Sequence, residues 1–214
     1  MKIIYAKNYK PFHTLYRIWH HSGGTSINPY ISKENETAES IEVAHKFKFK
    51  FPSKYMVDSN GRPRYGGYNF IINRDGSWIQ SRAIGEETAA NRYWNYNGIA
   101  ISICIIGNFN KNLFGRMIDR PTHQQILTIR FLDSQLPKAL NKSHRFLSPT
   151  IGYGSGLSDD WIKDTLNSPP KPDLTDLQRV INAIRRMIAE LQFRFSKLKL
   201  GGRLPDCQET NSRG

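Results

Sequence analysis

The chain has 214 residues and a formal net charge of +13, with 38% hydrophobic and 23% charged residues. This length allows one well-buried core with an appendage, and no apolar stretch approaches the ~18 residues of a membrane span. The charge favours a polyanionic partner, but no nucleic-acid-binding motif is recognisable, so no nucleic acid is expected.

The first predicted elements are a strand and a helix. Residues 15–19 are typical of a short strand, which leads into a loop at His20. Residues 37–49 have a helix-compatible pattern, and Thr37 can act as the N-cap. Residues 54–66 are expected to form a loop because they contain Asp-Ser-Asn-Gly and a proline.

A hairpin and a buried strand follow. Residues 68–72 and 78–82 are expected to pair as strands across a tight turn at residues 74–77. The run 99–106 is apolar apart from one serine, which indicates a central strand that is covered on both faces. Cys104 in this run is then a buried, unreactive thiol.

The order of elements predicts the fold class and the domains. A further helix is predicted from Pro121 to about Leu136. Because strands and helices alternate, we expect an α/β fold with a mixed central β-sheet flanked by helices. Residues 1–167 are assigned to this domain, 168–173 to a Pro-rich linker, and 174–214 to a basic C-terminal helix and tail.

The C-terminal segment carries a heptad repeat of apolar residues, called here the heptad seam. Its alternating spacings of four and three predict a helix with a narrow apolar stripe. This pattern fits both a helix docked on the preceding domain and a coiled coil that forms a homo-oligomer. Residues 179–203 hold seven Lys or Arg against Glu190 alone, which suits an anionic cell-wall polymer, a membrane surface or simple solvation. The seam consists of Leu174, Leu177, Ile181, Ile184, Ile188, Leu191, Phe195 and Leu198.

Histidines stand at two places where the chain could present a metal ligand. His20 and His21 end a short apolar strand, where the backbone is rigid and a side chain can still meet a substrate. His144 comes much later, before the glycine-rich run 152–156. One imidazole from each segment could hold zinc, and zinc with an open position makes water nucleophilic near neutral pH. This hypothesis requires the two segments to meet.

Four sequence blocks, in this order, carry a resemblance to a known family. They are Trp19-His20-His21-Ser22, residues 67–76 (GYNFIINRDG), residues 97–101 (NGIAI) through 107–109 (GNF), and His144-Arg145. The ordered set resembles the type-2 N-acetylmuramoyl-L-alanine amidases, which include phage lysozymes of the T7 kind and animal peptidoglycan-recognition proteins. The resemblance spans about residues 14–165, and it implies the amidase/peptidoglycan-recognition fold.

The resemblance implies a zinc site with one departure. In the family, zinc is held by a His at the end of the first strand, a His in the late His-Arg block and a Cys eight residues later. Carried over, His20 and His144 are the two histidine ligands, and Gly152 stands where the Cys would be. Glycine offers no metal donor, so zinc binding is expected to be weaker. Carboxylates at positions 159 and 160, or the distant Cys207, are the alternative third ligands.

The resemblance also implies catalytic and substrate-binding residues. Tyr68 matches the family's catalytic tyrosine, and its phenol, with an ordinary pKa near ~10, suits a hydrogen bond to the oxyanion. Aromatic packing on the sheet is the alternative role for Tyr68. Thr150 matches a second polar site that stabilises the tetrahedral intermediate. The residues that correspond to the family's substrate groove are Arg82, Tyr93, Trp94 and Asn97.

Together these observations predict an endolysin-like zinc amidase that cleaves the bond between N-acetylmuramic acid and L-alanine in peptidoglycan. The alternative is a non-catalytic peptidoglycan-binding protein of the same fold, because Gly152 replaces the expected ligand. The first seven residues lack the apolar centre and cleavage site of a secretory signal. We therefore expect the chain to be made in the cytoplasm without a signal peptide and to act on the bacterial cell wall after release by another factor.

Overall fold

The computed structural model describes most of the first 168 residues and a short part of the C-terminal segment. The described residues are 2–23, 31–91, 94–110, 114, 116–144, 157–168, 181–182, 184–185 and 187–188. The chain divides into two compact units, Met1–Pro170 and Lys171–Gly214. None of the described helices is long and apolar enough to cross a membrane.

The first unit is built on a five-stranded sheet with the order β3-β2-β4-β1-β5. β1, β2, β4 and β5 run parallel, and β3 is antiparallel to β2. The strands are β1 (Tyr16–His21), β2 (Phe70–Ile72), β3 (Trp78–Gln80), β4 (Ala100–Ile105) and β5 (Leu140–Ser143). The predicted α/β fold with a mixed central sheet is therefore confirmed.

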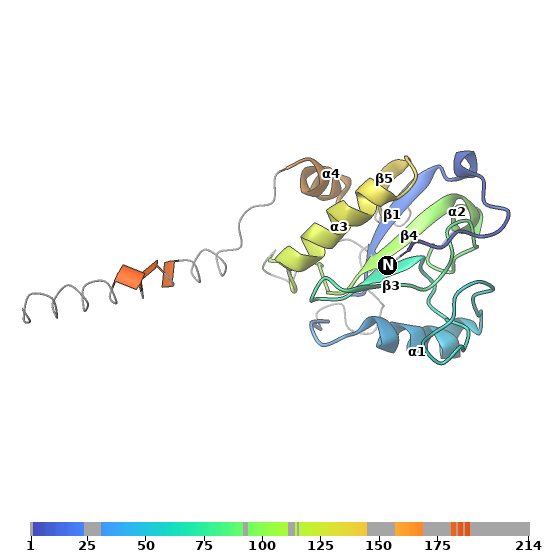
Figure 1. The fold of residues 1–214 in the computed structure, drawn as a ribbon, viewed down its shortest axis with the longest axis horizontal. Coiled ribbons are helices and arrows are strands. Elements are labelled where there is room, and N and C mark those ends of the chain that lie inside the picture. The colour runs from blue at the N-terminus through green and yellow to red at the C-terminus, as the bar shows by residue number, and fades with distance from the viewer. Residues whose placement is uncertain are drawn as a thin grey trace, which may run out of the picture. The chain divides into compact units, whose positions relative to one another are not determined.

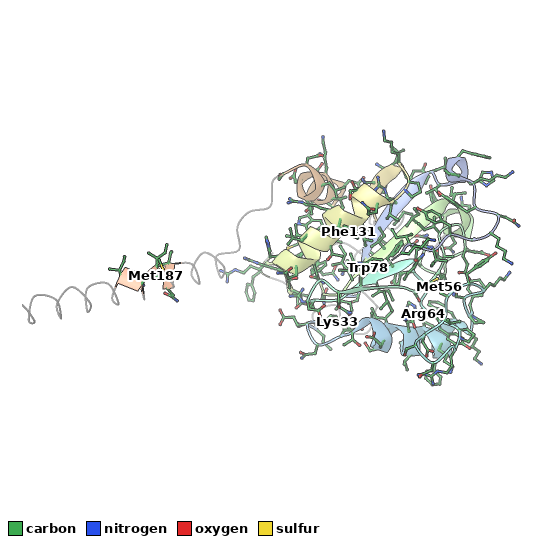
Figure 2. The ribbon with its side chains drawn as sticks, viewed as in Figure 1. Lys33, Met56, Arg64, Trp78, Phe131 and Met187 are labelled. Atoms are coloured by element: carbon green, nitrogen blue, oxygen red, sulfur yellow. The ribbon has the colours of Figure 1, made fainter. Side chains whose placement is uncertain are left out.

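Helices cover both faces of the sheet (Figure 1). α1 lies on one face, and α3 with α4 lies on the other; in Figure 2, Arg64 marks the α1 side and Phe131 the α3 side. The helices are η1 (Pro11–His13), α1 (Ala38–Phe49), α2 (Trp94–Ile99), α3 (His123–Gln135) and α4 (Asp159–Asn167).

The pattern of β4 explains the two-sided packing. All six of its residues are buried. Successive side chains point to opposite faces, so Ile103 joins the main core under α3, while Cys104 joins the smaller core under α1. The central, fully covered strand predicted at residues 99–106 is confirmed, and so is the buried state of Cys104.

The predicted helix starts are also confirmed. Thr37 caps α1 in a capping box with Ser40, and Thr122 caps α3 in the same way with Gln125. The hairpin is present as well: β2 and β3 pair across a turn in which Gly76 has a φ of +83°, a value that favours glycine. Its strands are shorter than the predicted ranges.

Five elements differ from the sequence prediction, and two of them, η1 and α2, are short helices that were not predicted. β1 continues through His21, two residues beyond the predicted end, because His20 and His21 pair with Cys104 and Ile105 of β4. β5 and α4 were not predicted. β5 is a polar edge strand with the sequence Leu-Asn-Lys-Ser, which has no apolar alternation.

The second unit is described for six residues, all of them helical. Ile184, Met187 and Ile188 are each about half exposed. Ile184 and Ile188 belong to the heptad seam, and the rest of the seam apart from Ile181 lies outside the described residues, as does most of the predicted basic face.

Candidate active site

The pairing of β1 with β5 brings His20 and His144 together. In the parallel register, Trp19 lies opposite Ser143, so the next residue of each strand is a histidine. The centroids of the two imidazole rings are 4.4 Å apart. The convergence that the sequence hypothesis required is therefore present. His21 points to the other face and packs on Phe109, with 5.7 Å between the rings, as the alternation of a strand predicts.

Tyr68 reaches the same place from the neighbouring strands. It comes just before β2, which pairs with β4, and β4 in turn places Cys104 opposite His20. The centroid of the phenol ring is 5.1 Å from that of His20. On its other side the ring of Tyr68 lies 5.5 Å from the ring of His45.

His45 holds the backbone next to Tyr68 in position. Its Nδ1 accepts a hydrogen bond of 2.8 Å from the backbone N–H of Gly67. A Cβ at Gly67 would lie 3.2 Å from that same Nδ1, so only glycine allows this close approach without displacement. The sequence analysis did not assign His45 a role at the site; the structure gives it a supporting one.

Burial keeps the two facing imidazoles neutral. His20 is 2% exposed, and its pKa is well below the ordinary value because of burial and the neighbouring histidines 144 and 21. Burial lowers the pKa of His144 to about 4. The Nε2 atom of each ring is buried and has no hydrogen-bond partner among the described residues. Two neutral imidazoles with free ring nitrogens are what a metal ion requires.

The phenol of Tyr68 is held in its protonated form. Burial, with a smaller effect of the adjacent Cys104 and of Glu36, raises the pKa of Tyr68 well above its usual value. The prediction of an ordinary pKa is therefore wrong. A phenol that stays protonated remains a hydrogen-bond donor over the whole neutral and mildly alkaline range.

Two further polar side chains at the site were missed by the sequence analysis. Asn91 donates a hydrogen bond from Nδ2 to Ser102 Oγ (3.1 Å), and its amide lies close enough to His20 to oppose the fall in the pKa of that ring. The Glu36 carboxylate is near enough to raise the pKa of both Tyr68 and Cys104, and its buried Oε2 has no partner in the described part of the chain. No local sequence pattern marks either residue.

The predicted substrate role of Arg82 is corrected. Its side chain is 0% exposed. Nε donates to the carbonyl of Gly66 (2.7 Å), the terminal nitrogens bind the carbonyl of Phe51 and the carboxylate of Glu86, and the guanidinium lies over the Phe51 ring. All donors are directed into the protein, so Arg82 supports the loops before β2 and cannot reach a substrate in this arrangement.

Asn97 is corrected in the same way. It is 2% exposed, and its Oδ1 accepts hydrogen bonds from the Asn91 N–H (2.9 Å) and Thr88 Oγ1 (3.1 Å). Its Nδ2 donates to the Asn91 carbonyl. Asn97 therefore shapes the turn that carries Asn91, and it has no free polar atom for a ligand.

The structure describes only some of the other residues that were assigned to the site. Trp94 begins α2, but its side chain is not described, and Tyr93, Thr150 and Gly152 lie outside the described residues. Asp159, an alternative third ligand, accepts hydrogen bonds from the Ser143 N–H (2.7 Å) and from Lys142 Nζ (3.0 Å) at the end of β5. It acts there as a structural group. Asp160 is exposed in the first turn of α4, and Cys207 lies outside the described residues.

The side chains at the site match part of the ligand set of a zinc ion. His20 and His144 fit, because each offers a neutral nitrogen with no other partner. Within the described residues no group of three His, Cys, Asp or Glu side chains could hold a metal. The described residues therefore supply two of the three protein ligands that a catalytic zinc site usually has.

Comparison with known families decides the relationship of the chain. The family described as N-acetylmuramoyl-L-alanine amidase matches residues 12–141, which include β1 to β4, α3 and the start of β5. The chain belongs to this amidase family. No protein in the curated set matches the sequence.

Several solved structures are similar to the amidase domain. N-acetylmuramoyl-L-alanine amidase LysC from Clostridium intestinale has a TM-score of 0.49 at 22% identity, over 79% of this chain and 99% of that one. The Ph2119 endolysin from a Thermus scotoductus bacteriophage has a TM-score of 0.49 at 20% identity, over 78% and 92%. Bumblebee PGRP-SA has a TM-score of 0.46 at 22% identity, over 80% and 91%.

Proposed function

We propose that this family member is a zinc-dependent amidase, which hydrolyses the amide bond between N-acetylmuramic acid and L-alanine in peptidoglycan. The observation that supports this most is the meeting of His20 and His144, with 4.4 Å between their rings and both Nε2 atoms free of partners. Tyr68, 5.1 Å from His20, provides a protonated phenol beside them. The cell wall is accordingly the proposed place of action.

In this proposal His20 and His144 hold the metal through Nε2. Zinc held there would supply Lewis acidity and would lower the pKa of a bound water toward neutrality. Tyr68 donates its O–H to the oxyanion that develops from the amide carbonyl, and its raised pKa keeps that proton in place. Asn91 and His45 orient the His20 and Tyr68 rings, as outer partners do in metal sites.

The roles of the residues outside the described chain extend this proposal. Thr150 is proposed as a second oxyanion donor, and Tyr93 and Trp94 as the aromatic side chains that contact the sugar or the stem peptide. Arg82 and Asn97 are left out of the substrate site because both are buried and paired.

A specific observation favours a second candidate function. Gly152 takes the place of the family's third ligand, and the described residues offer no substitute. A pair of histidines binds zinc more weakly than three protein ligands do. The alternative is therefore a protein that binds peptidoglycan without cutting it.

Metal analysis separates the two functions. An enzyme should carry near-stoichiometric zinc after purification and should release stem peptide from a soluble muropeptide. Metal-free protein that still retains the muropeptide would establish the binder. The variant Gly152→Cys should raise zinc affinity, whereas Gly152→Ser, a matched control with a poor metal donor, should not. Equal zinc contents for both variants would contradict the placement of the third ligand.

We also propose roles for the C-terminal unit. Its basic helix would hold the protein on an anionic cell-wall polymer or membrane surface, and the heptad seam would pair copies of the chain. Truncation before Pro169 should leave a folded domain. In sedimentation, its particles should contain fewer copies of the chain than those of the full-length protein. Equal association states for the two chains would rule out pairing through the seam.

A further inference from the structure

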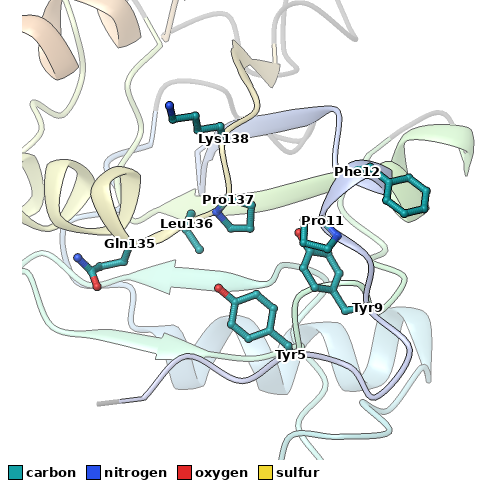
Figure 3. A pocket seen from close by; sticks show the side chains of 8 residues that line it. All are labelled: Tyr5, Tyr9, Pro11, Phe12, Gln135, Leu136, Pro137 and Lys138. Atoms are coloured by element: carbon teal, nitrogen blue, oxygen red, sulfur yellow. The ribbon is translucent and has the colours of Figure 1, made fainter.

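A second pocket lies at the opposite end of β1 and β5 from the candidate active site. It has a volume of about 730 Å³ and is formed by the segment before β1 and the segment before β5 (Figure 3). His20 and His144 stand at the other ends of these two parallel strands. Tyr16 and His20 are four positions apart along β1, which corresponds to about 13 Å. The pocket is therefore distinct from the metal site.

The walls of this pocket are fixed by hydrogen bonds. Gln80 binds the backbone of Ile4 on both sides, through Oε1 (2.8 Å) and Nε2 (2.7 Å), and Ile84 pairs with the same segment. Tyr9 is bonded to Thr14 Oγ1 at 3.0 Å and packs on the main core. The aromatic surface is thus held in position before any ligand arrives.

The pocket exposes two aromatic side chains. Phe12 is 70% exposed and Tyr5 is 41% exposed. The rings of Tyr5 and Tyr9 lie 5.2 Å apart, and together with Pro11 and Pro137 they form an apolar lining. Such rings present flat faces, with the Tyr5 hydroxyl as a polar edge.

The charge around these rings has one sign. Lys138 lines the pocket, and the ammonium of Lys10 lies 5.9 Å from the centre of the Phe12 ring. None of the described residues that line the pocket is acidic. The pocket therefore combines aromatic faces with cations, and it complements a ligand that has apolar ring faces and negative charges.

We propose that this pocket binds a glycan strand of peptidoglycan at a second point, remote from the bond that is cut. The inference rests on the proposed function. The C–H faces of sugar rings stack on Phe12 and Tyr5, and Lys10 and Lys138 pair with the carboxylates of the wall polymer. Because one long strand can engage both sites, the two contacts add through effective concentration, whereas a short soluble fragment engages the active site alone.

The test uses three substitutions in the pocket and a matched set elsewhere. Phe12→Ala, Tyr5→Ala and Lys138→Glu remove the aromatic faces and reverse the charge. Phe47→Ala and Lys46→Glu serve as controls, because both residues are exposed on α1 and Phe47 is 75% exposed. Thermal unfolding of each variant establishes that it is folded. Binding is measured by co-sedimentation with purified peptidoglycan sacculi, and hydrolysis with a soluble muropeptide.

The pocket variants should bind sacculi about tenfold or more weakly, with hydrolysis of the muropeptide unchanged, and the α1 variants should resemble the parent chain. Glycan chains freed of stem peptides should compete with sacculi for the parent chain and not for the pocket variants. Unchanged sacculus binding, or an equal loss in the α1 variants, would overturn the inference. A change from dimer to monomer in the pocket variants would also overturn the inference, because the pocket would then bind a second copy of the chain. If the parent chain does not hydrolyse the muropeptide but still binds sacculi through the pocket, the amidase proposal alone would be overturned.

Discussion

Two groups of buried polar side chains in the amidase domain differ in their hydrogen bonding. Around Arg82, Glu86 and Asn97, donors and acceptors are matched: Glu86, for example, accepts from Ser53, the Lys54 N–H and the Ala83 N–H. At His20 and His144, the rings lie 4.4 Å apart and each has a buried Nε2 without a partner in the described residues. The resemblance assigned residues of both groups to the site, Arg82 and Asn97 to the substrate groove and the two histidines to the metal, so it does not separate the groups.

The difference shows how a structural polar network is distinguished from a binding site. An unpaired buried polar atom costs about 1–3 kcal/mol, so such an atom calls for an explanation, and a binding role is one. The paired network around Arg82 stabilises the loops. The unpaired nitrogens of the histidine pair leave a position for a ligand, and the following predictions test this division.

The largest effect is expected for the histidine pair. His20→Ala and His144→Ala should each lower zinc affinity by more than the roughly 100-fold that loss of an outer partner of a metal ligand costs, and should abolish hydrolysis. Zinc content by elemental analysis and stem-peptide release are the two measurements. His123→Gln, at the start of α3, is the control and should retain both. Unaltered zinc content in His144→Ala would exclude this residue as a ligand.

Arg82 should show the opposite behaviour. Arg82→Met removes one partner from a buried ion pair and leaves Glu86 without its nearest cation. We expect the free energy of unfolding to fall by about 3–5 kcal/mol, measured by urea denaturation, with hydrolysis per folded molecule unchanged. Arg62→Met is the comparison, since the Arg62 side chain is 72% exposed in its ion pair with Asp58 and should contribute about 0–1 kcal/mol. A specific loss of activity in folded Arg82→Met would restore the substrate role.

Tyr68→Phe separates catalysis from packing. The ring contacts with His20 and His45 remain, and only the hydroxyl is lost. If the phenol donates to the oxyanion, kcat should fall by about 10²–10³ while zinc content stays the same. Tyr55→Phe, in the exposed loop before β2, provides the control. Should kcat remain within a few-fold of the parent value, Tyr68 would have only the packing role.

The sequence predicts the fold well where a local pattern has a single structural solution. The N-cap Thr37 and the apolar run of β4 are examples, because each satisfies buried or terminal groups in one way. β5 was not predicted because a short polar edge strand has no such pattern and forms through its pairing with β1. The contact between His20 and His144 depends on that pairing.

The candidate site follows the same rule. The order of the motif blocks predicted that His20, Tyr68 and His144 belong together, and the parallel register places them side by side. The wrong assignments of Arg82 and Asn97 arose because position along the chain does not say which way a side chain points. Asn91 and Glu36 reach the site through loops whose path is set by tertiary contacts, and these leave no mark in the local sequence.

The smallest predicted effect concerns pH and His45. Burial, with the nearby charges of Lys48 and Arg82, lowers the pKa of His45 in the folded protein to about 4, whereas an unfolded histidine has a pKa near ~6.5. The unfolded chain therefore takes up a proton first as the pH falls, and stability that is present above about pH 6.5 is lost progressively toward pH 4.

His45→Gln keeps an acceptor for the Gly67 N–H but does not titrate. In urea unfolding with a chelator present, this variant should lose on the order of 1–2 kcal/mol less than the parent between pH 7 and pH 4.5. Parallel pH profiles for the two proteins would show that His45 is not the buried neutral base that supports Tyr68.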